Sequence, residues 1–231
     1  MVNLLMTDSP LFGILLSIVT YGIGTYTYKK VKSSIANPLL ISVILSMIFL
    51  HFTGISYSKF YIGGEYINFL LGPATVALIV PLYEKRHLLK ENFLAILAGI
   101  IAGSITAVFS ILLCCKVFNL STPLTVSLMP KSITTAIAVE LTNEFGGMAA
   151  ITAVAIMLTG IEGAILGPEF LKKVGIKDPV ATGIAIGTAS HAIGTSRARK
   201  IGDIEGAMSG LSIAVAGLVT VVLMPFVINY V

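Results

Sequence analysis

One lysine stands in the middle of a long apolar stretch. Residues 121–142 read STPLTVSLMPKSITTAIAVELT, with Pro130 and Lys131 at the centre. A cation within hydrocarbon costs at least about 2.5–3.5 kcal/mol on insertion scales, so Lys131 must face a cavity or a partner. Pro130 frees backbone groups, and an ammonium beside hydroxyl groups suits a carboxylate. The hydroxyl-bearing neighbours are Ser132, Thr134 and Thr135. The alternative is an ordinary loop between two short helices.

A second polar cluster occupies residues 187–197, which read GTASHAIGTSR. Its small residues permit close backbone approach, and Ser190, His191 and Thr195 offer hydrogen-bond donors. Histidine changes charge near neutral pH, so His191 is a candidate proton carrier. The competing interpretation of His191 is a structural hydrogen bond to a backbone carbonyl. Arg197 either caps a substrate carboxylate or anchors the chain on the cytoplasmic side.

Two carboxylates lie in apolar surroundings. Glu140 is late in the 121–142 stretch, and Glu162 is within the apolar run 148–166. An intramembrane carboxylate is a candidate proton carrier or a counter-ion for Lys131. For Glu162 we favour a solvated position near the cytoplasmic interface, whereas for Glu140 both interpretations stay open.

Two further positions complete the candidate substrate site. Asn37 precedes Pro38 at the start of an apolar run, where helix capping is the favoured role and a place in the cavity the alternative. Thr75 follows Gly72 and Pro73, which either kink a helix or expose amides to the site. The sequence shows no phosphate-binding glycine loop, metal-ligand set or nucleophile elbow, so we expect no enzyme, no cofactor and no metal.

Composition places these residues in a membrane protein. Of 231 residues, 56% are hydrophobic and 11% are charged, against about 25% charged in a typical soluble domain. No basic stripe interleaved with aromatics indicates nucleic-acid binding. We therefore expect an all-α polytopic membrane protein forming a single domain over residues 1–231, embedded in the lipid bilayer.

The apolar runs predict about six spanning helices and two segments that re-enter the membrane without crossing it. The spans are roughly 9–28, 37–55, 67–83, 93–115, 148–166 and 207–230. Residues 121–142 and 180–200 are rich in small and hydroxyl residues and predict broken helices or re-entrant hairpins. Such opposed elements are typical of inverted-repeat transporters, although no clear sequence repeat is visible.

The distribution of basic residues supports this topology. With the N-terminus outside, twelve of the fifteen lysines and arginines fall on the inner side. Lys59 and Lys116 fall outside, and Lys131 lies at membrane depth. If residues 121–142 crossed the membrane instead, the basic loop 172–177 would move outside and the positive-inside bias would weaken.

At these residues the chain resembles the LrgB/CidB family. The matching pieces follow the family's order over nearly the whole chain and are residues 37–40, 71–78, 81–83, 130–135, 163–168 and 187–195. Ala136 stands where a proline usually follows the paired threonines, and Glu162 where an aliphatic residue is usual.

The resemblance implies two different functions. The family was named for regulators of murein hydrolase export and autolysis, often called antiholin-like, and a smaller LrgA/CidA-type membrane protein is the implied partner. Its plastid relatives resemble glycolate/glycerate carriers, and bacterial members are linked to pyruvate movement. A buried lysine with hydroxyl groups favours a carrier of small 2-hydroxy or 2-oxo monocarboxylates in the cell inner (plasma) membrane, using proton coupling or exchange. We expect a homodimer. A holin/antiholin-like modulator of lysis is the alternative.

Overall fold

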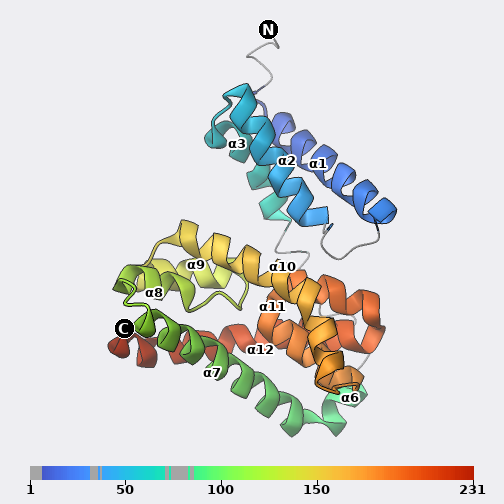
Figure 1. Ribbon diagram of the computed structural model, residues 1–231, viewed down its shortest axis with the longest axis vertical. Helices are drawn as coiled ribbons and strands as arrows, with labels where there is room; N and C mark the ends of the chain where they lie inside the picture. Colours follow the sequence, from blue (N-terminus) through green and yellow to red (C-terminus); the bar gives the residue numbers. More distant parts are fainter. Residues whose placement is uncertain (1–6, 32–35, 37, 71–72, 74–82, 84–85) are drawn as a thin grey trace. The chain divides into compact units, whose positions relative to one another are not determined.

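The computed structural model describes residues 7–31, 36, 38–70, 73, 83 and 86–231. Helices account for most of this part of the chain, and it contains no strand, which confirms the predicted all-α class. The chain groups into two compact units, residues 1–77 and residues 78–231, and each is described by itself (Figure 1). The single domain predicted over residues 1–231 stays a prediction.

The first unit is built on an antiparallel helix pair. Helix α1 (Pro10–Val31) is followed by α2 (Pro38–Thr53) and α3 (Tyr57–Phe69). Gly24 of α1 lies against the backbone of Pro38, and Thr20 Oγ1 is 2.9 Å from Ser42 Oγ in a buried hydrogen bond. Small and hydroxyl residues therefore let α1 and α2 pack closely, as is common where both helices face lipid.

Helix α3 was not predicted, because residues 57–66 carry tyrosines, a lysine and glycines rather than a long apolar run. Two features hold it as a helix. The rings of Tyr57 and Tyr61 lie 5.7 Å apart at helical spacing, and Gly63 meets Gly13 of α1 backbone to backbone. The predicted third span, 67–83, lies largely outside the described residues, as does Thr75.

The second unit contains the remaining helices. They are α6 (Arg86–Glu91), α7 (Phe93–Val117), α8 (Thr122–Leu128), α9 (Thr135–Glu144), α10 (Ala149–Lys173), α11 (Pro179–Ile201), α12 (Asp203–Val227) and the 3₁₀ turn η2 (Ile228–Tyr230). In the described part of the chain, four helices are long and apolar enough to cross a membrane, namely α1, α7, α10 and α12 with η2. Each coincides with a predicted span, while α2 is a shorter apolar helix at the predicted second span.

Helix α11 is a hairpin with two arms. At His191 the backbone has φ 42° and ψ −141°, so the helix breaks there. On the first arm, Gly183 lies against Glu205 of α12 and Gly187 against Ser209. On the second arm the order is reversed: a 2.7 Å hydrogen bond joins Thr195 to Ser209, and Arg199 lies against Gly206. The arms are therefore antiparallel, and the predicted hairpin at 180–200 is confirmed.

The stretch 121–142 is also interrupted, as predicted. Helices α8 and α9 are separated by residues 129–134, which form turns and which we name the Lys131 segment. Its backbone is held by bonds from Lys131 N to Leu128 O (3.2 Å) and from Ile133 N to Pro130 O (3.3 Å). Figure 1 shows α8 beside the last turns of α7, the end of that helix that lies near the C-terminus of the chain.

The two interrupted elements enter the second unit from opposite ends and meet near its middle. Helix α11 begins after the C-terminal end of α10, whereas α8 follows the C-terminal end of α7. A small cavity at the middle of α7 is lined by Ser104 of α7, by Met129 and Ser132 of the Lys131 segment, and by Thr188 of α11. This opposed arrangement is the one predicted, while an inverted repeat in the strict sense stays a prediction.

The orientation can be tested with single cysteines at the two ends of the second unit. In a background lacking Cys114 and Cys115, we expect Phe118→Cys to react rapidly with an impermeant thiol reagent added to intact cells. Val174→Cys should resist it, because the basic loop beside it favours the cytoplasm. Both positions are well exposed, at 72% and 52%, so accessibility in the protein does not limit labelling. The reverse labelling pattern would overturn the orientation.

Candidate functional site

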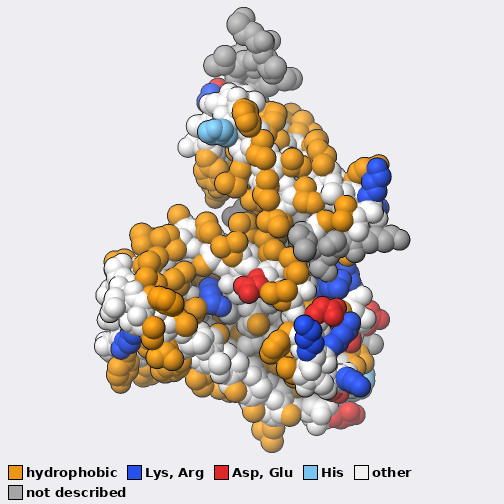
Figure 2. Space-filling view, in the orientation of Figure 1, with side chains coloured by type: hydrophobic (Ala, Val, Ile, Leu, Met, Phe, Trp, Pro, Cys, Tyr) orange, Lys and Arg blue, Asp and Glu red, His pale blue; other side chains and the backbone are white. Residues whose placement is uncertain are grey.

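A cavity of about 940 Å³ lies within the second unit, between α7, the Lys131 segment, α10 and α11. Its size is in the range of small-molecule sites, which are commonly 300–1,000 Å³. Asn92 and Asp178, at the starts of α7 and α11, mark one end of the cavity, which we call the outer end. Lys131 and Ser132 mark the other end, near the middle of the second unit, which we call the inner end. Figure 2 shows the hollow, with basic and acidic side chains at its rim among apolar ones. We name it the central cavity.

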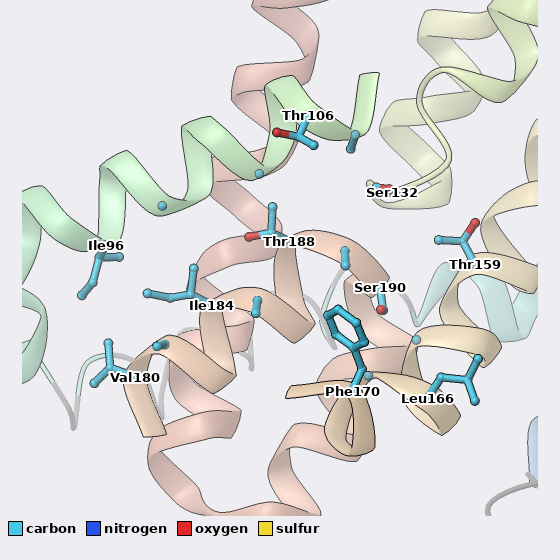
Figure 3. A pocket seen from close by; sticks show the side chains of 18 of the residues that line it. Ile96, Thr106, Ser132, Thr159, Leu166, Phe170, Val180, Ile184, Thr188 and Ser190 are labelled. Atoms are coloured by element: carbon cyan, nitrogen blue, oxygen red, sulfur yellow. The ribbon is translucent and has the colours of Figure 1, made fainter. Parts of the chain in front are cut away.

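Most of the wall is apolar or small. Helix α7 presents Ile96 and Gly99, and α10 presents Leu166 and Phe170 (Figure 3). The first arm of α11 contributes Ile184 to the wall. A wall of this kind excludes water from a bound molecule and strengthens any electrostatic interaction inside.

Three charged side chains line the cavity: Lys131, Glu162 and Asp178. Asp178 lies at the outer end, where its Oδ1 accepts a hydrogen bond from Ala181 N (2.8 Å) and caps α11. Lys131 is half-buried, and Glu162 attracts it electrostatically. In the described residues, however, no carboxylate lies within 4 Å of Lys131 Nζ. The ammonium therefore faces the cavity without a fixed ion pair.

Hydroxyl groups surround the same space at the inner end. Figure 3 shows Ser132 on the Lys131 segment, Thr188 and Ser190 on α11, and Thr159 on α10. Thr188 is only 5% exposed, and its Oγ1 has no hydrogen-bond partner in the described structure. Buried hydroxyl groups are normally paired, so an unpaired hydroxyl on a residue that lines the cavity is a candidate partner for a ligand or water.

The α11 tip, residues 190–192, is held against α10. His191 is 3% exposed, and its Nε2 donates to Ile156 O (2.9 Å). The approach requires glycine, since a Cβ at Gly163 would overlap Ser190 Oγ and one at Gly160 would lie 2.7 Å from His191 Cε1. Two residues of α10 thus set how deep the tip reaches into the central cavity.

The structure brings some of the predicted site residues together and separates others. Lys131, Ser132 and Ser190 line the central cavity, and His191 lies beside it in the tip with the structural hydrogen bond that was the competing interpretation. Thr195 bonds to Ser209 and to His191 O (2.9 Å), within the packing of α11 on α12.

Other candidates do not line this cavity. Thr134 is half-buried at the N-terminus of α9, and Thr135 and Glu140 are exposed on that helix. Arg197 is half-buried with an unpartnered Nε on the second arm of α11. Asn37 lies outside the described residues, like Thr75.

Several polar residues of the cavity were not among the predicted site residues, including Thr159, Asp178 and Thr188. Thr188 belongs to the recognised 187–197 cluster, but nothing in the sequence distinguishes it from its hydroxyl neighbours. For Glu162 a solvated position near the cytoplasmic interface was favoured over a role beside Lys131. It is exposed and lines the same cavity as Lys131, about 17 Å from the end of α10 at Lys173 at 1.5 Å per residue, and its depth in the membrane stays a prediction. The available signal was the unbroken apolar pattern on both sides of this carboxylate.

Close packing at Gly163 gives a testable consequence. We expect Gly163→Ala to destabilise the protein by about 1–3 kcal/mol, because the added methyl group must displace Ser190 and the tip. Gly22→Ala is the matched control, since a Cβ there meets nothing within 4 Å. Thermal unfolding in detergent measures both. An equal midpoint for the two variants would contradict the close contact between α10 and the tip.

The fold and cavity define a class: a multi-pass α-helical membrane protein in which two opposed interrupted elements enclose a central cavity with a lysine at its inner end. The chain belongs to the LrgB-like family, whose model matches residues 17–230. It is 40% identical over 220 residues to the antiholin-like protein LrgB of Bacillus subtilis (strain 168), covering 95% of each chain.

A second relative is the antiholin-like protein LrgB of Bacillus cereus (strain B4264). It is 36% identical over 226 residues, which cover 97% of this chain and 98% of the relative. The predicted family resemblance is thereby confirmed. No solved structure shows a significant match.

Proposed function

We propose that this protein carries small organic monocarboxylates across the membrane, with 2-hydroxy and 2-oxo acids such as glycolate, glycerate, lactate or pyruvate as substrates. The observation that carries the proposal is Lys131, a cation without a fixed ion pair at the inner end of a cavity of about 940 Å³. An unpaired charge there is costly unless water or a ligand compensates it.

The surrounding groups suit this substrate class. The ammonium of Lys131 and the hydroxyl groups of Ser132 and Ser190 offer charge-assisted bonds to a carboxylate. The unpartnered hydroxyl of Thr188 is available for the oxygen on the adjacent carbon. The proposed role is binding and passage without a chemical step, so the protein is a carrier rather than an enzyme.

The opposed elements suggest how passage takes place. The Lys131 segment and the α11 tip each reach the middle of the second unit from one end. Small movements of either would open the central cavity toward one side or the other, as in alternating access around a midplane site. The proposed location is the cell inner (plasma) membrane, and the proposed assembly is a homodimer.

Thermal unfolding of the purified protein with a series of anions tests the binding step. A ligand present at one hundred times its dissociation constant stabilises the folded state by about 2.7 kcal/mol. We expect glycolate, glycerate, lactate and pyruvate to raise the unfolding midpoint, acetate to raise it less, and glycerol to have no effect. No shift with any of the four anions would count against the carrier.

A second candidate function is favoured by the relatives' names, and these names support it more directly than they support a carrier. As an antiholin-like modulator of murein hydrolase activity and lysis, the protein would act with a smaller LrgA/CidA-type membrane protein and would need no substrate. Lysis in cells that carry Lys131→Ala distinguishes the two. A modulator without a substrate should retain its full effect, whereas a carrier whose activity underlies the phenotype should lose it.

A further inference from the structure

We propose that Glu162 is the proton-binding counter-ion of Lys131, so that each substrate anion binds together with one proton. This inference rests on the proposed carrier function. Glu162 and Lys131 line the same cavity but come from different elements, α10 and the Lys131 segment. The juxtaposition of the two charges, rather than either residue alone, carries the inference.

Glu162 lies near the middle of α10 rather than at either end. Helix α10 has 25 residues, and Glu162 lies about 20 Å from Ala149 and about 17 Å from Lys173 at 1.5 Å per residue. The residues one turn away on the same face are Leu158 and Leu166, exposed by 56% and 55%. Glu162 is itself exposed, and among the charged residues that line the central cavity Lys131 is the cation that attracts it.

The two charges compensate each other without blocking the site. In the described residues Glu162 forms no ion pair within 4 Å and accepts no hydrogen bond. Its interaction with Lys131 is therefore electrostatic attraction without a direct contact. An ammonium that is attracted but not locked remains available to an arriving carboxylate.

Charge balance then links the anion to a proton. Before binding, Lys131 and Glu162 leave the inner end of the central cavity neutral. An arriving carboxylate competes with Glu162 for the same ammonium and gives the site a net negative charge in surroundings of low dielectric constant. A proton taken up by Glu162 restores neutrality and frees Lys131 for the substrate. By linkage, the proton tightens anion binding and the anion tightens proton binding.

The other titratable groups around the cavity are less suited to this role. Asp178, on α11, lies at the outer end and caps its own helix. His191, in the α11 tip, is buried and donates through Nε2 to Ile156 O. The described residues that α7 contributes to the wall include no titratable group. Glu162 is therefore the group whose protonation state the substrate alters most directly.

The test is glycolate binding to the purified protein as a function of pH, from pH 5.5 to pH 8. With one proton bound per anion, the affinity of the wild type should fall by up to tenfold per pH unit in the upper part of this range. Glu162→Gln should bind with nearly constant affinity. Glu169→Gln is the matched control on the same helix, because Glu169 is exposed and pairs only with Lys172 at 3.4 Å. It should keep the wild-type pH profile.

Transport measurements separate coupling from binding. In proteoliposomes, Glu162→Gln should lose accumulation driven by a pH gradient while retaining exchange of labelled for unlabelled glycolate. A Glu162→Gln protein that keeps the wild-type pH profile would overturn the inference, as would a His191→Gln protein that alone loses it. Wild-type binding that does not vary with pH would remove proton linkage and leave the carrier standing. Absence of binding at every pH would instead count against the carrier itself.

Discussion

Lys131→Ala is expected to abolish stabilisation by glycolate while the protein still inserts and purifies. Removing one partner of a desolvated charge pair costs about 3–5 kcal/mol, which corresponds to a hundredfold or greater loss of affinity. Thermal unfolding with and without ligand measures the effect. The wild type should gain stability by mass action, and the variant should gain none.

The stability of the ligand-free variant carries separate information. Removal of a lysine locked to a fixed carboxylate would leave that carboxylate unpaired and destabilise the fold. Glu140 is exposed on α9, outside the cavity wall. Glu162 attracts Lys131 across the cavity but is itself exposed and forms no ion pair within 4 Å in the described part of the chain, so water can solvate it when the lysine is removed. We therefore expect Lys131→Ala to unfold near the wild-type midpoint. Lys172→Ala, which removes an exposed lysine of α10, should match the wild type in both stability and ligand response. A wild-type ligand shift in Lys131→Ala would take Lys131 out of the site.

His191→Ala is expected to be the most destabilising substitution in the α11 tip, at about 3–5 kcal/mol. It removes a buried ring and the hydrogen bond to Ile156 O, and it places alanine at φ 42°. His191→Gly loses the same ring and the same bond but accommodates the left-handed backbone. It should therefore be more stable than His191→Ala by about 1–2 kcal/mol.

This order is the reverse of the order inside a helix, where glycine costs about 1 kcal/mol relative to alanine. Ser196, exposed on the second arm of α11, provides the matched comparison. There Ser196→Ala should be more stable than Ser196→Gly. The unfolding midpoints of His191→Ala, His191→Gly, Ser196→Ala and Ser196→Gly measure the order of alanine and glycine at both positions. Alanine more stable than glycine at both positions would mean that α11 continues through residue 191 as an ordinary helix.

Much of the fold could be predicted because lipid imposes simple rules on sequence. Long apolar runs gave the positions of α1, α7, α10 and α12. The basic residues favoured re-entry of 121–142 and 180–200 over crossing, which stays a prediction. Helix α3 was not predicted. It packs on α1 through backbone contact between Gly63 and Gly13, which are fifty positions apart in the chain. Such a contact leaves no periodic signal.

The site was predictable only in part, for a related reason. Lys131 and the hydroxyl groups near it are conspicuous in an apolar sequence, since each carries its own desolvation cost. Whether a neighbouring side chain shares their cavity depends on how separate helices pack. Glu162 lines the central cavity with Lys131, whereas Glu140, closer in sequence and equally acidic, does not. Sequence distance alone therefore does not indicate which carboxylate shares the cavity with Lys131.

Uptake of labelled glycolate into proteoliposomes that contain only this chain tests the carrier most directly. Empty liposomes and liposomes with Lys131→Ala protein, reconstituted to the same density, are the controls. We predict saturable uptake by the wild type, competition by unlabelled pyruvate or lactate, and uptake by Lys131→Ala no greater than in empty liposomes. Wild-type uptake equal to that of empty liposomes, or equal uptake by Lys131→Ala protein, would contradict transport through the Lys131 site.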